Sequence, residues 1–211
     1  MSVLEQIRRH RIVAAFRGVT QEQAVDTALA LYEGGIRMME ITFDQTDPHK
    51  LRNTPEIINS IKERLGDRVH LGAGTVLAAE EALCAQKAGA EFLLAPNVND
   101  AVIHKAKELG MGIIPGAFTA TEIVHAYQSG ADLIKVFPAG NLGIRYLKSL
   151  KGPLGHIPLL PMGGVDQNNL KDFLKVAEGV GIGSNLVDLS LIQNKQWTAL
   201  SELAKEYTTQ L

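Results

Sequence analysis

A lysine stands inside an apolar, strand-like run of this sequence. The run is DLIKVF, residues 132–137, in which Lys135 lies between Ile134 and Val136. An ammonium group in an apolar interior is costly unless it is paired, reaches water or gives up its proton. A lysine that gives up its proton is a nucleophile and can form a Schiff base with a ketone.

A carboxylate occupies the same kind of position in an earlier apolar run, IRMMEIT. Side chains alternate between the two faces of a strand, so Glu40 shares a face with Met38, and Lys135 shares a face with Leu133. If both faces line one interior, the amine and the carboxylate converge, and Glu40 can carry protons for the amine. Two structural interpretations compete with this one. Lys135 could extend along apolar surface to water, or the two groups could form an ion pair.

Two glycine-rich segments near the end of the chain suit an anion. They are PMGGV (161–165) and GIGSN (181–185). Glycines let the backbone approach an anion closely, and N–H groups at helix starts bind phosphate. The candidate phosphate ligands are Gly163, Gly164, Gly183 and Ser184. Either segment alone could equally be a tight turn with a helix cap.

Apolar, β-rich runs alternate with amphipathic helical patterns along the whole chain. Eight runs are predicted strands: residues 11–16, 36–42, 69–73, 91–95, 112–115, 132–137, 157–161 and 180–183. Near-continuous apolar strands with helices between them predict a parallel sheet, and eight such units can close into a (β/α)8 TIM barrel. We expect a short helix before the first strand and a single domain over residues 1–211. A doubly wound open sheet is the alternative.

The positions of the unusual residues favour the barrel. Catalytic groups of such barrels come from the carboxyl ends of several strands. Arg17 ends the first predicted strand, Thr75 and Pro96 follow the third and fourth, and Lys135 lies late in the sixth. The two glycine-rich segments follow the seventh and eighth strands, where this fold usually binds phosphate.

Composition and motifs exclude several other classes. The net charge of −2 and the pI of about 6.3 give no electrostatic footprint for nucleic acid or an anionic membrane. No signal-peptide core or long apolar run is present and Cys84 is the single cysteine, so we expect a cytoplasmic protein. LGAGTVL lacks the third glycine and the lysine of nucleotide-binding loops, and no two histidines stand four residues apart. We therefore expect no nucleotide cofactor and no metal.

Several short motifs together are similar to one known family. They are R-G at 17–18, G-G-I-R-x-x-E-I-T at 34–42, G-A-G-T-V-L at 72–77, A-P-N around Pro96, I-P-G at 114–116, K-x-F-P-A at 135–139 and the two glycine-rich segments. In this order the chain resembles, over nearly its full length, the 2-keto-3-deoxy-6-phosphogluconate (KHG/KDPG) aldolases. The resemblance implies a class I aldolase on a (β/α)8 barrel, assembled as a homotrimer, without metal or cofactor.

The resemblance also implies roles for the candidate residues. Lys135 would form the Schiff base with pyruvate or the 2-keto acid, and Glu40 would donate and accept the protons. Arg17 and Thr75 would contact the keto-acid substrate, and Pro96 and Phe137 would line the pocket. The 6-phosphate would be bound by Gly163, Gly164, Gly183 and Ser184.

The chain departs from the family pattern at two positions. Many gluconate-type members have an arginine four residues after the glutamate, where this chain has Asp44, and often a threonine where it has Met162. A carboxylate cannot bind the pyruvate carboxylate, so we expect Arg17 to replace that arginine. The C4 configuration of the substrate stays open among the phosphogluconate, phosphogalactonate and 4-hydroxy-2-oxoglutarate types. A phosphosugar epimerase or isomerase, or a noncatalytic phosphosugar-binding barrel, would use these residues without a Schiff base.

Overall fold

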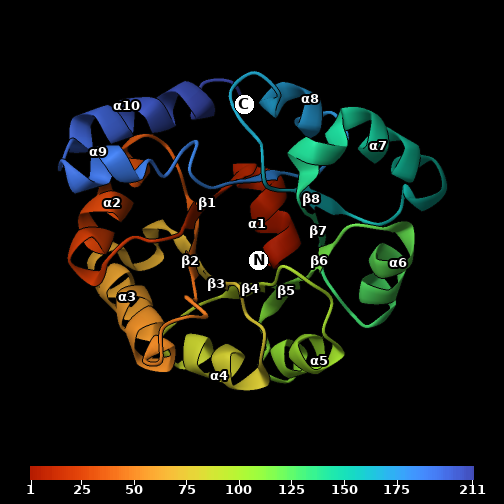
Figure 1. Ribbon diagram of the computed structural model, residues 1–211, viewed down its shortest axis with the longest axis horizontal. Helices are drawn as coiled ribbons and strands as arrows, with labels where there is room; N and C mark the ends of the chain where they lie inside the picture. The colour runs from red at the N-terminus through yellow and green to blue at the C-terminus, as the bar shows by residue number, and fades with distance from the viewer.

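Strands and helices alternate along the chain, and the helices form a ring around the strands (Figure 1). The computed structural model describes all residues, Met1–Leu211. The strands are β1 Ile12–Phe16, β2 Met38–Thr42, β3 His70–Gly74, β4 Phe92–Leu94, β5 Gly112–Ile114, β6 Gly116–Ala117, β7 Ile134–Val136, β8 Leu159–Pro161 and β9 Val180–Ile182. The helices are α1 Val3–His10, α2 Gln21–Glu33, α3 Lys50–Leu65, η1 Gly66–Arg68 (a 3₁₀ turn), α4 Ala79–Lys87, α5 Asp100–Glu108, α6 Ala120–Gln128, α7 Ala139–Leu154, α8 Leu170–Leu174, α9 Leu189–Gln193 and α10 Trp197–Thr208.

The strands pair in parallel in two sheets. One sheet has the order β5-β4-β3-β2-β1-β9 and the other the order β6-β7-β8. A parallel bridge between Met162 and Gly181 links the end of β8 to β9. All eight predicted strands are present, and the fifth is followed by β6, which lies just beyond Pro115. Proline has no backbone N–H for a sheet ladder, so it is a natural point for this strand to be interrupted.

Both faces of the curled sheet are buried, as the nearly continuous apolar strands predict. In β1, Ile12, Ala14 and Phe16 belong to the larger apolar cluster between strands and helices, whereas Val13 and Ala15 belong to a smaller cluster on the opposite, inner face. The inner cluster comprises Val3, Ile7, Val13, Ala15, Met38, Phe92, Leu94, Ile114, Leu133, Leu160 and Met162.

Helix α1 covers the inner cluster at the amino-terminal ends of the strands. A Cβ atom at Gly112, the first residue of β5, would lie 2.6 Å from the Val3 side chain, and one at Gly179, just before β9, would lie 2.7 Å from Ile7. Figure 1 accordingly shows α1 at the centre of the ring of strands. The opposite end, where the strands finish, is left for the loops that carry the candidate residues.

Local sequence signals set the helix starts. Thr20 and Gln23 form a capping box at the start of α2, and Thr119 and Glu122 form one at the start of α6. Such reciprocal bonds satisfy backbone N–H groups that the first turn leaves without partners. Helix α2 ends at Glu33, and Gly34 is its C-cap residue. None of the helices is both long enough and apolar enough to cross a membrane.

Candidate active site

Lys135 is the middle residue of β7, with Gly116 of β6 and Leu160 of β8 beside it in register. It is only 4% exposed. Its strand neighbour two positions earlier, Leu133, belongs to the inner apolar cluster, so alternation places the lysine on the inner face. Its amine lies 4.8 Å from the centre of the Phe137 ring. The interpretation that Lys135 extends to water at the surface is therefore wrong.

Glu40 occupies the matching position in β2, between Ala15 of β1 and Gly72 of β3. It is 1% exposed, and its Oε2 atom is buried without a hydrogen-bond partner. The side chain packs against Gly74, where a Cβ atom would lie 2.9 Å from Oε2. Gly74, which is in register with Thr42, therefore leaves room for the carboxyl group inside the sheet.

The amine and the carboxyl group influence each other without forming an ion pair. Burial raises the pKa of the Glu40 carboxyl, although the charges of Lys135 and Arg17 oppose this change. Burial also lowers the pKa of the Lys135 amine, an effect that Arg17 strengthens and Glu40 opposes. Neither group accepts or donates a hydrogen bond to the other. The interpretation of a direct structural ion pair is therefore wrong, and both groups are shifted toward their neutral forms.

Arg17 and Thr75 come together at the carboxyl ends of β1 and β3. The guanidinium Nη2 of Arg17 donates a hydrogen bond to Thr75 Oγ1 at 3.0 Å. Thr75 has a φ angle of 57°, an unusual backbone conformation for a β-branched residue. The Arg17 charge affects Glu40 and Lys135 as described, and it helps lower the pKa of the Asp44 carboxyl, after the larger effect of hydrogen bonds from Thr46.

Phe137 directly follows the lysine strand, and Pro96 lies beside the neighbouring strand β6. Phe137 is 38% exposed, and a Cβ atom at Gly163 would lie 2.9 Å from its ring. The Pro96 backbone packs against Gly116, the residue in register with Lys135. These contacts connect the buried amine through the Phe137 ring to the first glycine-rich loop.

The two glycine-rich loops are adjacent. Gly163 and Gly164 have φ angles of 82° and 78°, which glycine adopts without strain. The Asn185 side-chain amide donates to the carbonyl of Val165 at 2.8 Å and ties the second loop to the first. Helices α8 and α9 begin at Leu170 and Leu189, several residues after the loops. Backbone N–H groups of the loops, including those near Gly183 and Ser184, would therefore have to serve as phosphate ligands without a helix start beside them.

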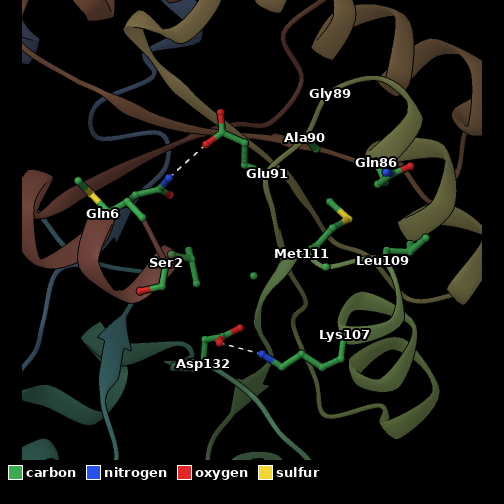
Figure 2. A pocket seen from close by; sticks show the side chains of 14 residues that line it. Ser2, Gln6, Gln86, Gly89, Ala90, Glu91, Lys107, Leu109, Met111 and Asp132 are labelled. Carbon is green, nitrogen blue, oxygen red and sulfur yellow. Dashed lines mark hydrogen bonds and ion pairs between the residues drawn. The ribbon is translucent and has the colours of Figure 1, made fainter.

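Two cavities lie at opposite ends of the strands. One, of about 780 Å³, is lined by Arg17, Thr42, Asp44 and Thr75 among other residues, and so opens beside the candidate site. The other, of about 590 Å³, lies between α1 and the starts of β4 and β5 (Figure 2).

Figure 2 shows two contacts between side chains of the second cavity. Gln6 Nε2 donates to Glu91 at 3.2 Å, and the Lys107 ammonium donates to Asp132 at 2.8 Å. Glu91 also lies 3.3 Å from the Lys62 ammonium. These groups lie at the end of the strands away from Thr75 and Pro96.

Sequence reasoning missed several residues of the candidate site. Gln45 donates to the carbonyl of Thr75 at 2.9 Å, and Thr42 Oγ1 donates to the carbonyl of Phe16 at 2.8 Å. Asn185 was missed as well. Gln45 and Asn185 stand outside the apolar runs, so the signal that singled out Lys135 and Glu40 does not apply to them. Thr42 lies within the E-I-T motif and could have been noticed there.

Comparisons with known proteins agree with this geometry. A family model described as KDPG and KHG aldolase matches residues 3–203. The chain is 37% identical over 175 residues to the 2-dehydro-3-deoxy-phosphogluconate aldolase of Treponema pallidum, covering 82% of this chain and 80% of the relative. It is 33% identical over 177 residues to the 2-dehydro-3-deoxy-6-phosphogalactonate aldolase of Escherichia coli, covering 83% of each. The crystal structure of the 2-keto-3-deoxy-6-phosphogluconate aldolase of Zymomonas mobilis superposes with a TM-score of 0.82 at 27% identity, covering 99% of this chain and 97% of that one.

Replacing Lys135 by methionine should raise the free energy of unfolding at neutral pH. The lowered pKa means that the ammonium form is less favourable in the folded protein than in the unfolded chain. This cost is fully present below the folded pKa and disappears as the pH approaches about 10.4, where the amine is becoming neutral in both states. Urea unfolding should therefore show an advantage of Lys135→Met over the wild type that shrinks as the pH rises.

Lys87→Met is the matched control, because Lys87 is exposed at the end of α4. The stability difference from the wild type should change more with pH for Lys135→Met than for Lys87→Met. A constant difference between wild type and Lys135→Met would contradict the lowered pKa.

Proposed function

The chain belongs to the KDPG and KHG aldolase family, and from this premise we propose that it is a class I aldolase. Its reaction is cleavage of 2-dehydro-3-deoxy-6-phosphogluconate to pyruvate and D-glyceraldehyde 3-phosphate. The observation that carries the proposal is the Lys135 amine, buried on the inner face of the sheet with a lowered pKa and without an ion-pair partner. A lysine in this state supplies the free amine that Schiff-base chemistry requires.

Lys135 begins the reaction by attacking the C2 ketone of the substrate. Loss of water gives an iminium, which draws electrons from the C3–C4 bond. That bond then breaks, glyceraldehyde 3-phosphate leaves, and the pyruvate fragment stays on the lysine as an enamine. Protonation of the enamine at C3 and hydrolysis of the resulting iminium release pyruvate and regenerate the amine.

Glu40 moves the protons of this sequence. It removes the proton of the C4 hydroxyl group, directly or through water, as the bond breaks, and it returns a proton to C3 of the enamine. Burial raises its pKa toward neutrality, where a carboxyl group can both accept and donate a proton. Its Oε2 atom has no partner within the protein, so it is free to bond to the substrate or a water molecule.

The remaining candidate residues hold the substrate. Arg17, the cation beside Thr75, binds the keto-acid carboxylate, a role that the Asp44 carboxylate cannot fill. Phe137 and Pro96 line the pocket around the amine. The backbone of Gly163, Gly164, Gly183 and Ser184 binds the 6-phosphate, which is supported by the side-by-side position of the two loops.

The same premise extends to the architecture and assembly. We propose that the two sheets form one closed (β/α)8 barrel, because β5 and β6 flank a single proline and the Met162–Gly181 bridge joins β8 to β9. We further propose a single domain over residues 1–211 and, from the family resemblance, a homotrimer. The cytoplasmic location that the sequence suggests stays a prediction.

The phosphogalactonate type is the second candidate for the substrate. Asp44 and Met162 depart from the gluconate-type pattern, and a phosphogalactonate aldolase is one of the relatives. Cleavage of 4-hydroxy-2-oxoglutarate is the third candidate. We expect the purified protein to cleave the gluconate-type 6-phosphate with a higher kcat/KM than its C4 epimer, measured by coupled assay of pyruvate. A preference for the epimer would assign the chain to the galactonate type.

Borohydride trapping tests the Schiff base itself. Incubation with pyruvate followed by reduction should leave a pyruvyl adduct on Lys135, found by peptide mass spectrometry. Lys135→Arg keeps the positive charge but removes the reactive amine, so it should lose both adduct and turnover. Glu40→Gln should still form adduct while its kcat falls, because only proton transfer is impaired.

The outcome also separates the alternatives from other classes. A phosphosugar epimerase or isomerase would use Glu40 as its base without a covalent lysine, and a noncatalytic phosphosugar-binding barrel would use only the glycine-rich loops. A protein that forms no adduct and turns over normally after Lys135→Arg would contradict the aldolase.

A further inference from the structure

We propose that Gln45 is a positioning residue of this site, which holds Thr75 and thereby places the Arg17 guanidinium. The inference rests on the proposed function, because it assumes that Arg17 binds the keto-acid carboxylate. It identifies how the chain fixes its carboxylate-binding cation in the absence of an arginine at position 44.

The backbone of Thr75 has an unusual conformation. Its φ angle of 57° lies in the left-handed region, which β-branched residues rarely adopt because the side chain crowds the backbone. Such a conformation persists only when surrounding contacts hold it. The neighbouring backbone is held by hydrogen bonds from Phe43 N to Gly74 O at 2.9 Å and from Val76 N to Leu94 O at 3.1 Å. The carbonyl of Thr75 itself is held by a side chain.

That side chain is Gln45, in the loop between β2 and α3. Its Nε2 atom donates to the Thr75 carbonyl at 2.9 Å and to Glu81 Oε1 at 3.0 Å. Its Oε1 atom accepts a hydrogen bond from the Lys50 ammonium. The reverse orientation of the amide would turn its oxygen toward two acceptors and its nitrogen toward a donor, so the surroundings fix the orientation.

Glu81 anchors this amide to the framework. The carboxylate is 1% exposed and accepts backbone hydrogen bonds from Leu77 at 2.6 Å and Ala78 at 3.2 Å, at the start of α4. Lys50, the first residue of α3, lies 2.7 Å from its Oε1 atom. Although burial acts in the opposite direction, hydrogen bonds from Lys50, Leu77 and Gln45 hold the pKa of the Glu81 carboxyl below its ordinary value. The carboxylate is thus a fixed negative charge that aligns Gln45.

Thr75 in turn holds the Arg17 guanidinium. Arg17 is exposed and has no ion-pair partner, and its one side-chain hydrogen bond goes from Nη2 to Thr75 Oγ1 at 3.0 Å. The Asp44 carboxylate, which could otherwise attract it, is held by two hydrogen bonds from Thr46. The position of the guanidinium therefore depends on the rotamer and backbone of Thr75.

Gln45 acts indirectly and does not itself bind the substrate. It lines the cavity beside the site, but its two N–H groups and its carbonyl oxygen are all bonded within the protein. Donation of a hydrogen bond to a substrate would break one of these bonds. The geometry assigns Gln45 to the support of Arg17 and leaves the substrate to Arg17 and Thr75.

The variant Gln45→Met removes the donors but keeps the side-chain length. We expect the KM for the 2-keto acid to rise about fivefold to tenfold, with a smaller change in kcat, because a misplaced Arg17 weakens binding of a carboxylate that does not change during the reaction. Gln128→Met is the matched control, because Gln128 is exposed at the end of α6 and donates no side-chain hydrogen bond. Its KM should equal that of the wild type.

A second variant keeps the test decisive if Gln45→Met folds poorly. Gln45→Glu preserves size and a partner for Lys50, but its ionised carboxylate has no proton to donate to the Thr75 carbonyl. It should raise KM at least as much as Gln45→Met. A KM equal to that of the wild type in a folded Gln45→Glu protein would overturn the proposal.

A double-mutant cycle tests whether the effect passes through Arg17. In an Arg17→Met background, Gln45→Met should change kcat/KM clearly less than it does in the wild type, because the cation is gone and only the effect through Thr75 remains. A full effect in both backgrounds would overturn the proposal. Trapping of pyruvate on Lys135 in the wild type distinguishes this failure from that of the proposed function. Wild-type adduct with an unchanged Gln45→Met KM overturns only the role of Gln45, whereas a wild type that neither traps nor cleaves overturns both.

Discussion

The burial of Lys135 and Glu40 on one inner face, without a direct bond between them, is the constraint on which the site depends. Each charge is costly in an apolar interior, and a direct ion pair would reduce that cost for both. The two groups do not form such a pair, so burial shifts both of them toward their neutral forms. A neutral amine and a proton-carrying carboxyl group are what Schiff-base aldol chemistry needs.

The rest of the fold makes that arrangement possible. Helix α1 fills the amino-terminal end of the interior, and Gly74 leaves space for the Glu40 carboxyl group. The loops at the other end carry the proposed substrate ligands, which are the Arg17 guanidinium and the glycine-rich backbone. Helix α1 and the proposed site therefore lie at opposite ends of the strands, a division that is also typical of TIM barrels.

The sequence predicts much of this, and the reasons for its success and failure are physical. Lys135 and Glu40 stand out because a charge in an apolar strand is costly, and strand alternation places them on the correct face. The eight strands follow from composition, whereas β6 is hidden because two residues beyond Pro115 carry no periodic signal. Gln45 and Glu81 could not be predicted, because a hydrogen bond between segments far apart in sequence leaves no pattern along the chain. The sequence also did not predict that no helix starts directly after either glycine-rich loop, a feature that only the structure shows.

The central claim is best tested by measuring the protonation of Lys135 directly. An NMR titration of ¹³Cε-labelled lysine, with the Lys135 signal identified by its loss in Lys135→Arg, reports the pKa of this amine beside those of the exposed lysines. The lowered pKa predicts a midpoint clearly below about 10.4, the ordinary value for a lysine side chain. A Lys135 signal with a midpoint at or above that ordinary value would contradict the lowered pKa.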